Sequence, residues 1–242
     1  MAQSSERLPE GYEAGRFTAR PRRSAANAQP CPPGEHAAPT NAGWGGVLFV
    51  PESYNHARPA PFMLALHGAT GTGERMLGRW REAAEAFGVV VLCPSSETRT
   101  WDVLIGGYGS DVARIDTALR EVFARVNVNP ARCLVEGFSD GASYALGLGL
   151  ANGDLFTHVL ANSPGFCWPP SLVGQPRILI THGTQDQVLP INATSRMLAP
   201  QLEFNGYDVT YHEFEGGHQL TPEIMALSLR WAGLDGAQTR DT

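Results

Sequence analysis

Short apolar runs alternate with longer amphipathic segments along most of the chain. The apolar runs have strand length and are Val47–Val50, Phe62–Leu66, Val89–Leu92, Cys133–Val135, Val159–Ala161, Ile178–Thr181 and Val209–Phe214. The amphipathic segments are predicted helices over Glu74–Phe87, Asp111–Val126, Ser139–Ala151, Thr194–Asn205 and Pro222–Trp231. This alternation predicts an α/β fold with a mainly parallel central sheet covered by helices on both faces. Ligands in such folds bind at the carboxyl ends of the strands, so the loops that follow the strands are the place to look for chemistry.

The pattern divides the chain into one domain and two flanking segments. Residues 1–40 are rich in Pro, Ala and Arg, and we expect an N-terminal arm that is partly disordered, with a short edge strand over Gly15–Arg20. Residues 41–234 carry the alternation and are expected to form a single catalytic domain, and residues 235–242 a flexible tail.

Charge excludes several classes of function. The 242 residues carry 18 basic and 24 acidic side chains, a formal net charge of −6, which offers no surface for nucleic acid. Every basic residue is arginine, so Schiff-base chemistry and a P-loop lysine are excluded. No apolar run is long enough to span a bilayer, and the N-terminal residues lack the apolar stretch typical of a signal peptide. We expect a cytoplasmic protein, unless a signal was removed.

The four cysteines, Cys31, Cys93, Cys133 and Cys167, lack the spacing of a zinc site. We expect free thiols, with a Cys31–Cys167 disulfide left open. No other cluster has metal-ligand spacing, so neither a metal nor an organic cofactor is expected.

The segment from Glu136 to Ala142 has the pattern of a nucleophile elbow. It follows an apolar strand and opens a helix, with Gly137 and Gly141 two residues on either side of Ser139. Glycines there let strand and helix approach around a serine held on a strained turn. In a chain with 27 glycines the motif alone is weak, and Ser139 could be an ordinary small residue of a Gly-rich turn.

A second Gly-rich loop, Leu66–Gly73, follows another apolar strand and precedes a predicted helix. Acyl transfer develops negative charge on the carbonyl oxygen, which two backbone N–H groups can stabilise as an oxyanion hole. We expect the N–H groups of Ala69 and Asp140 to fill this role. His67 comes too early in the chain to be the base and is interpreted as bracing this loop.

Two later loops supply an acid and a base. Asp186 follows the strand Ile178–Thr181 and can orient an imidazole, although an aspartate in such a loop often shapes a turn. His218 follows the strand Val209–Phe214 on a Gly-bearing loop and has the position of a general base. The order Ser139, Asp186, His218 is that of α/β-hydrolases. His182 shows no partner pattern and is given no role.

The strand-end His67-Gly68, the elbow around Ser139, the segment His182 to Asp186 and the final Gly216-Gly217-His218 together resemble a known family. They are similar to the bacterial phospholipase/carboxylesterase and poly(3-hydroxybutyrate) depolymerase-like branch of the α/β-hydrolases, over about residues 44 to 232. The resemblance implies the α/β-hydrolase fold and carboxylic-ester hydrolysis through an acyl-serine. Asp140 departs from the Gln usual in carboxylesterase and thioesterase members, which favours the depolymerase-like side.

Substrate preference is the open part of the prediction. Trp101, Tyr108, Phe166 and Trp168 could form an acyl pocket near the elbow or could simply pack the loop bases. The stretch Asn162–Arg177 holds four prolines and is too short for a helical lid, so an open site and short-chain or aromatic esters are expected. A polyester depolymerase, thioesterase or peptidase with the same residues, or a non-catalytic binding protein, remain alternatives. The oligomeric state is not predicted.

Overall fold

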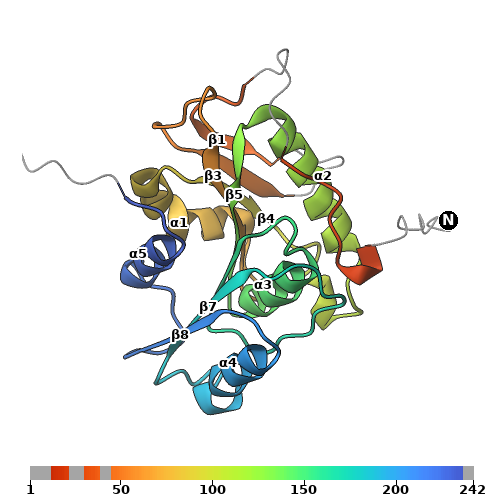
Figure 1. The fold of residues 1–242 in the computed structure, drawn as a ribbon, viewed down its shortest axis with the longest axis vertical. Coiled ribbons are helices and arrows are strands. Elements are labelled where there is room, and N and C mark those ends of the chain that lie inside the picture. The colour runs from red at the N-terminus through yellow and green to blue at the C-terminus, as the bar shows by residue number, and fades with distance from the viewer. Residues whose placement is uncertain (1–11, 22–29, 39–44, 237–242) are drawn as a thin grey trace, which may run out of the picture.

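In a computed structural model, which describes residues 12–21, 30–38 and 45–236, one twisted sheet forms the centre of the molecule (Figure 1). Its described strands lie in the order β1-β2-β4-β3-β5-β6-β7-β8. Their bounds are β1 Gly34–Ala37, β2 Gly46–Val50, β3 Ala60–Leu66, β4 Val90–Pro94, β5 Val128–Phe138, β6 His158–Asn162, β7 Arg177–Gly183 and β8 Val209–Phe214. From β4 to β8 every neighbouring pair is parallel, whereas β2 pairs antiparallel with both β1 and β4. The expectation of a mainly parallel sheet is confirmed.

Helices cover both faces of the sheet. The α-helices are α1 Gly73–Phe87, α2 Ser110–Arg125, α3 Asp140–Ala151, α4 Ser195–Phe204 and α5 Pro222–Trp231, and short 3-10 turns lie at Tyr12–Ala14, Asp102–Leu104 and Ile191–Ala193. The side chains of α1 and α5 form one buried cluster with strand residues such as Met63, whereas α2, α3 and α4 share the opposite cluster with residues such as Leu64. Adjacent strand residues thus point to opposite faces, as a sheet buried on both sides requires.

The predicted elements agree with the structure except at the N-terminal edge of the sheet. Each of the seven apolar runs overlaps a strand and each amphipathic segment overlaps a helix, with bounds that differ by about one residue or a few. Strand β1 was not predicted, because Gly34–Ala37 alternates between half-buried and exposed positions and carries no apolar run. The sheet therefore extends into the segment expected to be an arm.

The edge strand expected over Gly15–Arg20 is wrong: these residues run as an irregular strap over α2 and α3. Asp116 of α2 holds the strap, because its carboxylate accepts hydrogen bonds from the N–H groups of Thr18 and Ala19 at 2.8 Å and from the hydroxyls of Thr18 and Tyr12. Burial alone would raise the pKa of Asp116, but these donors and Arg120 lower it below its ordinary value. The remainder of the expected arm, residues 1–11, 22–29 and 39–40, lies outside the described residues, as does most of the expected tail.

No helix or strand lies between β6 and β7, where residues 163–176 form an irregular connection. This agrees with the expected lack of a helical lid at that position. Among the described residues no helix is long and apolar enough to cross a bilayer.

Candidate active site

The turn between β5 and α3 holds Ser139 in a strained conformation. Its φ of 59° and ψ of −121° lie in a region that non-glycine residues rarely occupy. A Cβ on Gly137 would lie 2.0 Å from the carbonyl oxygen of Gly141, and a Cβ on Gly141 would lie 2.2 Å from that of Leu66. The two glycines are therefore required by the close approach of strand and helix, and the elbow geometry expected from the sequence is present.

The loops after β7 and β8 bring Asp186 and His218 together. Backbone hydrogen bonds join them, from Thr184 N–H to the Phe214 carbonyl at 2.9 Å and from Gln185 N–H to the Gly216 carbonyl at 2.8 Å. Nδ1 of His218 lies 2.6 Å from Oδ2 of Asp186. This contact orients the imidazole with its Nε2 atom free to face another group.

Asp186 is buried and nevertheless held as a carboxylate. Its burial by itself would raise the pKa, but the N–H of Leu189, the His218 imidazole and the N–H of Val188 together lower the pKa of Asp186 below its ordinary value. The two N–H groups donate to Oδ1 at 2.8 and 2.9 Å, which leaves Oδ2 for imidazoles.

His182, to which the sequence assigned no role, is a second imidazole on Asp186. Its Nε2 atom lies 3.1 Å from Oδ2 of Asp186 and 2.9 Å from the carbonyl oxygen of Leu189, and its Nδ1 atom lies 2.6 Å from Oγ of Ser195. The carbonyl can only accept, so Nε2 carries the proton and Nδ1 accepts from Ser195. Burial lowers the pKa of His182, which favours this neutral form. In the sequence, the only indication of this contact is that His182 stands four residues before Asp186. That spacing alone does not show that the two side chains meet.

The loop between β3 and α1 lies directly against Ser139. A Cβ on Gly68 would be 3.2 Å from that of Ser139, and the N–H of Gly71 donates to the Gly68 carbonyl at 3.0 Å. Within the described part of the chain, the N–H groups of Ala69 and Asp140 have no hydrogen-bond acceptor. Both expected donors are therefore available at the elbow.

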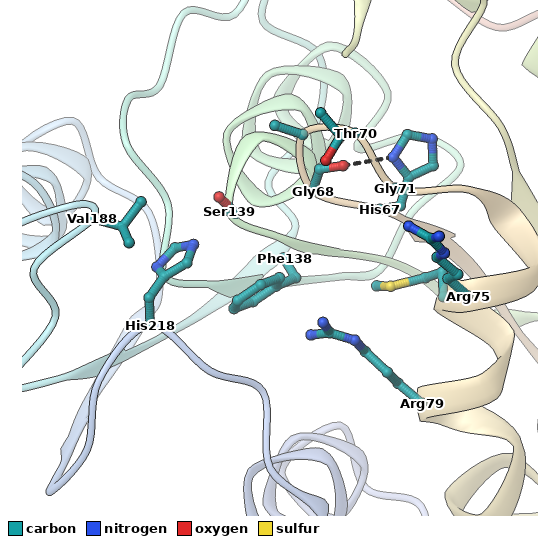
Figure 2. A pocket seen from close by; sticks show the side chains of 12 residues that line it. His67, Gly68, Thr70, Gly71, Arg75, Arg79, Phe138, Ser139, Val188 and His218 are labelled. Carbon is teal, nitrogen blue, oxygen red and sulfur yellow. Dashed lines mark hydrogen bonds between the residues drawn. The ribbon is translucent and has the colours of Figure 1, made fainter. Parts of the chain in front are cut away.

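His67 braces this loop, as expected. Its Nε2 atom accepts from the N–H of Ser96 at 3.0 Å, so the proton lies on Nδ1, which donates to the Gly68 carbonyl at 2.7 Å (Figure 2). Burial lowers the pKa of His67, which is consistent with a neutral ring.

Trp101 and Tyr108 do not lie in an acyl pocket. Trp101 is 0% exposed, donates its Nε1–H to the His67 carbonyl at 2.8 Å and stacks on Tyr144 at 5.0 Å. Tyr108 stacks on the other face of Tyr144 at 5.4 Å. The two aromatic side chains thus pack against Tyr144 and do not line the cavity that contains Ser139, as the alternative interpretation of loop-base packing requires.

Phe166 and Trp168 lie in the connection between β6 and β7. Their rings stack at 4.2 Å, and Trp168 is 61% exposed, while the N–H of Phe166 donates to Oγ of Ser143. Neither side chain lines the cavity that contains Ser139, so the structure does not unite these two residues with the elbow in one pocket.

A cavity of about 370 Å³ contains both Ser139 and His218. Its wall is formed by residues of the loop 67–71, by Phe138 and Val188, and by Arg75, Met76 and Arg79 of α1 (Figure 2). No hydrogen bond joins Ser139 to His218 among the described residues; in unliganded sites such bonds are often long and tighten when substrate binds. The two arginines were not predicted as site residues.

The cysteines and other ligand types do not add a metal centre. All four cysteines are free thiols, so the open Cys31–Cys167 disulfide is not formed. Among the described residues no group of three or more His, Cys, Asp or Glu side chains is placed to hold a metal ion.

The strand order and the helices on both faces define an α/β-hydrolase fold. A model of the Phospholipase/Carboxylesterase family matches residues 110–230, half of the chain, and the protein belongs to this family. The matched part contains Ser139, Asp186 and His218. No curated protein sequence matches the chain.

Solved structures of esterases share this fold at low sequence identity. A carboxylesterase from Bacillus cereus is 21% identical with a TM-score of 0.57, over 80% of this chain and 95% of that one. S-formylglutathione hydrolase from Staphylococcus aureus is 14% identical with a TM-score of 0.66, over 85% and 99%. A CE1 ferulic acid esterase from Anaeromyces mucronatus, in complex with ferulic acid, is 14% identical with a TM-score of 0.63, over 97% and 98%. These likenesses establish the fold.

Proposed function

We propose that the protein hydrolyses carboxylic esters through an acyl-serine intermediate, with Ser139 as nucleophile, His218 as general base and Asp186 as the acid that orients His218. The observation that carries the proposal is the contact between Nδ1 of His218 and the buried Asp186, beside a serine held on a strained elbow in the same cavity. Family membership supports the same reaction class.

In acylation, Oγ of Ser139 attacks the ester carbonyl carbon while Nε2 of His218 takes the hydroxyl proton. The imidazolium formed is stabilised by the Asp186 carboxylate, whose pKa is lowered by its hydrogen bonds. Negative charge on the substrate oxygen is stabilised by the N–H groups of Ala69 and Asp140. Nε2–H then protonates the alkoxide as the C–O bond breaks, and the alcohol leaves.

Deacylation repeats these steps with water as the nucleophile. His218 takes a proton from water, the hydroxide oxygen bonds to the acyl carbon, and the bond to Oγ breaks with return of the proton to Ser139. The net reaction consumes one ester and one water and releases one acid and one alcohol. The chain's own groups supply every proton transfer.

The proposal is tested by a substrate panel with a labelling experiment. Wild-type protein and Ser139→Ala are assayed on 4-nitrophenyl esters, thioesters, peptides and polyester films, and both are treated with a fluorophosphonate. We expect turnover of soluble 4-nitrophenyl esters and a single adduct on Ser139, both absent from Ser139→Ala. Turnover of only thioesters, peptides or films would replace the proposed substrate class, whereas ester hydrolysis retained by Ser139→Ala would refute the mechanism.

A further inference from the structure

One wall of the cavity that holds Ser139 is positively charged. Arg75 and Arg79 of α1 line it, and none of the other lining residues is an aspartate or glutamate. The close-up shows the Arg79 side chain extending from α1 toward Phe138, and Arg75 nearer the loop that carries His67 and Gly71 (Figure 2). The whole chain has a net charge of −6, so this charge is a local feature of the cavity.

Neither arginine forms an ion pair with a carboxylate in the described part of the chain. The charge of Arg79 acts on the buried Glu136, but burial raises the pKa of Glu136 to about 8. By contrast, Arg81 on the same helix pairs with Glu35, and Arg196 pairs with Glu213 on another face. These two guanidinium groups keep their hydrogen-bond donors for another ligand.

Arg79 is also positioned relative to the reacting groups. Its guanidinium carbon lies 5.0 Å from the centroid of the Phe138 ring, and the same ring lies 4.7 Å from the His218 imidazole. Phe138 precedes Ser139 directly. A cation–π contact therefore holds a positive charge one aromatic ring away from the candidate base.

The helix that carries the arginines is fixed to the loop that carries Ala69. Thr72 caps α1, its hydroxyl accepting from the N–H of Arg75, so the helix begins immediately after the loop 67–71. Positions 75 and 79 are one helical turn apart and project from the same face. A substrate carbonyl at Ala69 would thus lie in the same cavity that both guanidinium groups line.

We propose that the site selects esters that carry a carboxylate near the scissile bond, and that Arg75 and Arg79 bind this carboxylate. This inference rests on the proposed esterase function and specifies its substrate class. Guanidinium groups match a carboxylate with paired, charge-assisted hydrogen bonds. A positively charged cavity also concentrates anionic substrates. The carboxylate can belong to the acyl part or to the alcohol part of the ester, and the experiment distinguishes the two.

Two pairs of substrates isolate the effect of charge. In the first pair, 4-nitrophenyl hemiglutarate is compared with its methyl ester, so the charge is on the acyl part. In the second pair, 4-(butyryloxy)benzoate is compared with its methyl ester, so the charge is on the alcohol part. The ratio of kcat/KM for the charged over the neutral member is measured for wild type, Arg75→Gln, Arg79→Gln and the double variant. Using a ratio within each variant cancels differences in active fraction.

We expect this ratio to fall about tenfold in the double variant for at least one pair, mainly through a higher KM for the charged member, with smaller losses in each single variant. In wild type the ratio should fall as salt is added. Arg81→Gln is the matched control, because it removes the same charge from the same helix outside the cavity, and its ratio should equal that of wild type.

Equal ratios in wild type and the double variant for both pairs would overturn the inference while leaving ester hydrolysis intact. An Arg81→Gln variant that lowers the ratio as much as the double variant would also overturn it, because the effect would then be one of overall charge. Failure of the wild type to hydrolyse any of the four esters, charged or neutral, would instead remove the proposed function, and the inference with it.

Discussion

His182 and His218 both contact one oxygen of Asp186, and Nε2 of His182 lies 3.1 Å from Oδ2. His218 reaches the same oxygen at 2.6 Å. One imidazole is completely buried and neutral, and the other lines the cavity. The carboxylate therefore shares its negative charge between a fixed donor and the candidate base, so His182 is a positioning residue rather than a catalytic one.

Replacing His182 by Ala should lower kcat by about tenfold and raise the pH of the acid limb of the kcat/KM profile. Without the His182 donor, more of the charge on Asp186 acts on His218, which favours the imidazolium. Ser195→Ala is the control, since it removes the hydrogen bond at Nδ1 of His182 and leaves the contacts of Nε2 with Asp186 and with the Leu189 carbonyl. If the acid limb of the kcat/KM profile does not shift in His182→Ala, or shifts equally in Ser195→Ala, then His182 contributes only to packing. Thermal unfolding of both variants checks that they fold.

Removing Ser139, His218 or Asp186 should affect turnover unequally. His218→Ala and Ser139→Ala should each lower kcat by about 10⁵–10⁶, and Asp186→Ala by about 10⁴, because the carboxylate acts through the imidazole. A double variant of Ser139 and His218 should be no slower than the single variants. Initial rates on 4-nitrophenyl butyrate measure these values, and additive losses in the double variant would show that the residues do not act as a unit.

Short acyl chains should be preferred over long ones. The connection between β6 and β7 forms no helical cover, and the cavity of about 370 Å³ has Met76, Phe138 and Val188 as its large apolar side chains, a short apolar surface for a long chain. Rates should fall from 4-nitrophenyl butyrate to palmitate, without a jump as substrate passes its solubility limit. The measurement is initial rate against substrate concentration. A sharp rise when droplets form would mean that a cover exists and moves.

Stability should fall between pH 6 and 9 because of Glu136 in β5. Burial raises the pKa of Glu136 to about 8 despite a hydrogen bond from Asn162. The folded state keeps a proton here that the unfolded state has released, so the free energy of unfolding decreases as pH rises from about 5 to above 8. The free energy of unfolding is measured with urea at pH 6 and at pH 9. Its decrease between these pH values should be about 2 kcal/mol smaller for Glu136→Gln than for wild type. Parallel pH dependences of the two proteins would contradict the assignment.

The N-terminal strap should depend on Asp116. Asp116→Ala leaves the donors of Thr18, Ala19 and Tyr12 without their acceptor and should lower the free energy of unfolding by about 3 kcal/mol. Cleavage by trypsin within the strap should become faster at the same time. Asp154→Ala, which removes only exposed ion pairs with Arg16 and Arg20, should cost less than about 1 kcal/mol. Equal decreases in the free energy of unfolding of the two variants would show that Asp116 is not the main group that holds the strap.

The sequence predicted the sheet, its helices and the elbow because these follow local rules. Apolar runs bounded by turns specify buried parallel strands, and Gly137 and Gly141 are required by a close backbone approach that any serine elbow shares. The strap was missed because its partner, Asp116, lies about a hundred residues away, and a hydrogen-bonded carboxylate on a helix has no distinct periodicity.

For the aromatic loop residues, the sequence indicated the position in the chain but not the direction of the side chain. Trp101 and Tyr108 stand in loops beside the elbow, but their rings point into a stack on Tyr144 rather than into the cavity. Side-chain direction in an irregular loop is set by packing partners that the sequence does not reveal. Arg75 and Arg79 were overlooked for the same reason, since an exposed arginine on an amphipathic helix usually faces solvent.

One ring stack limits which positions of the protein tolerate substitution. It consists of His67, Trp101, Tyr144 and Tyr108. It ties the loop beside Ser139 to α3, and a substitution in any of these rings would disturb the backbone donors and the elbow together. The cavity-facing positions of α1 lie outside this stack. The connection of residues 163–176 meets the stack where the Trp168 carbonyl accepts a hydrogen bond from the Tyr108 hydroxyl, so its other exposed side chains can be varied with less risk. A directed-evolution library aimed at new substrates should therefore gain more variants with activity from these two segments than from the aromatic loop positions.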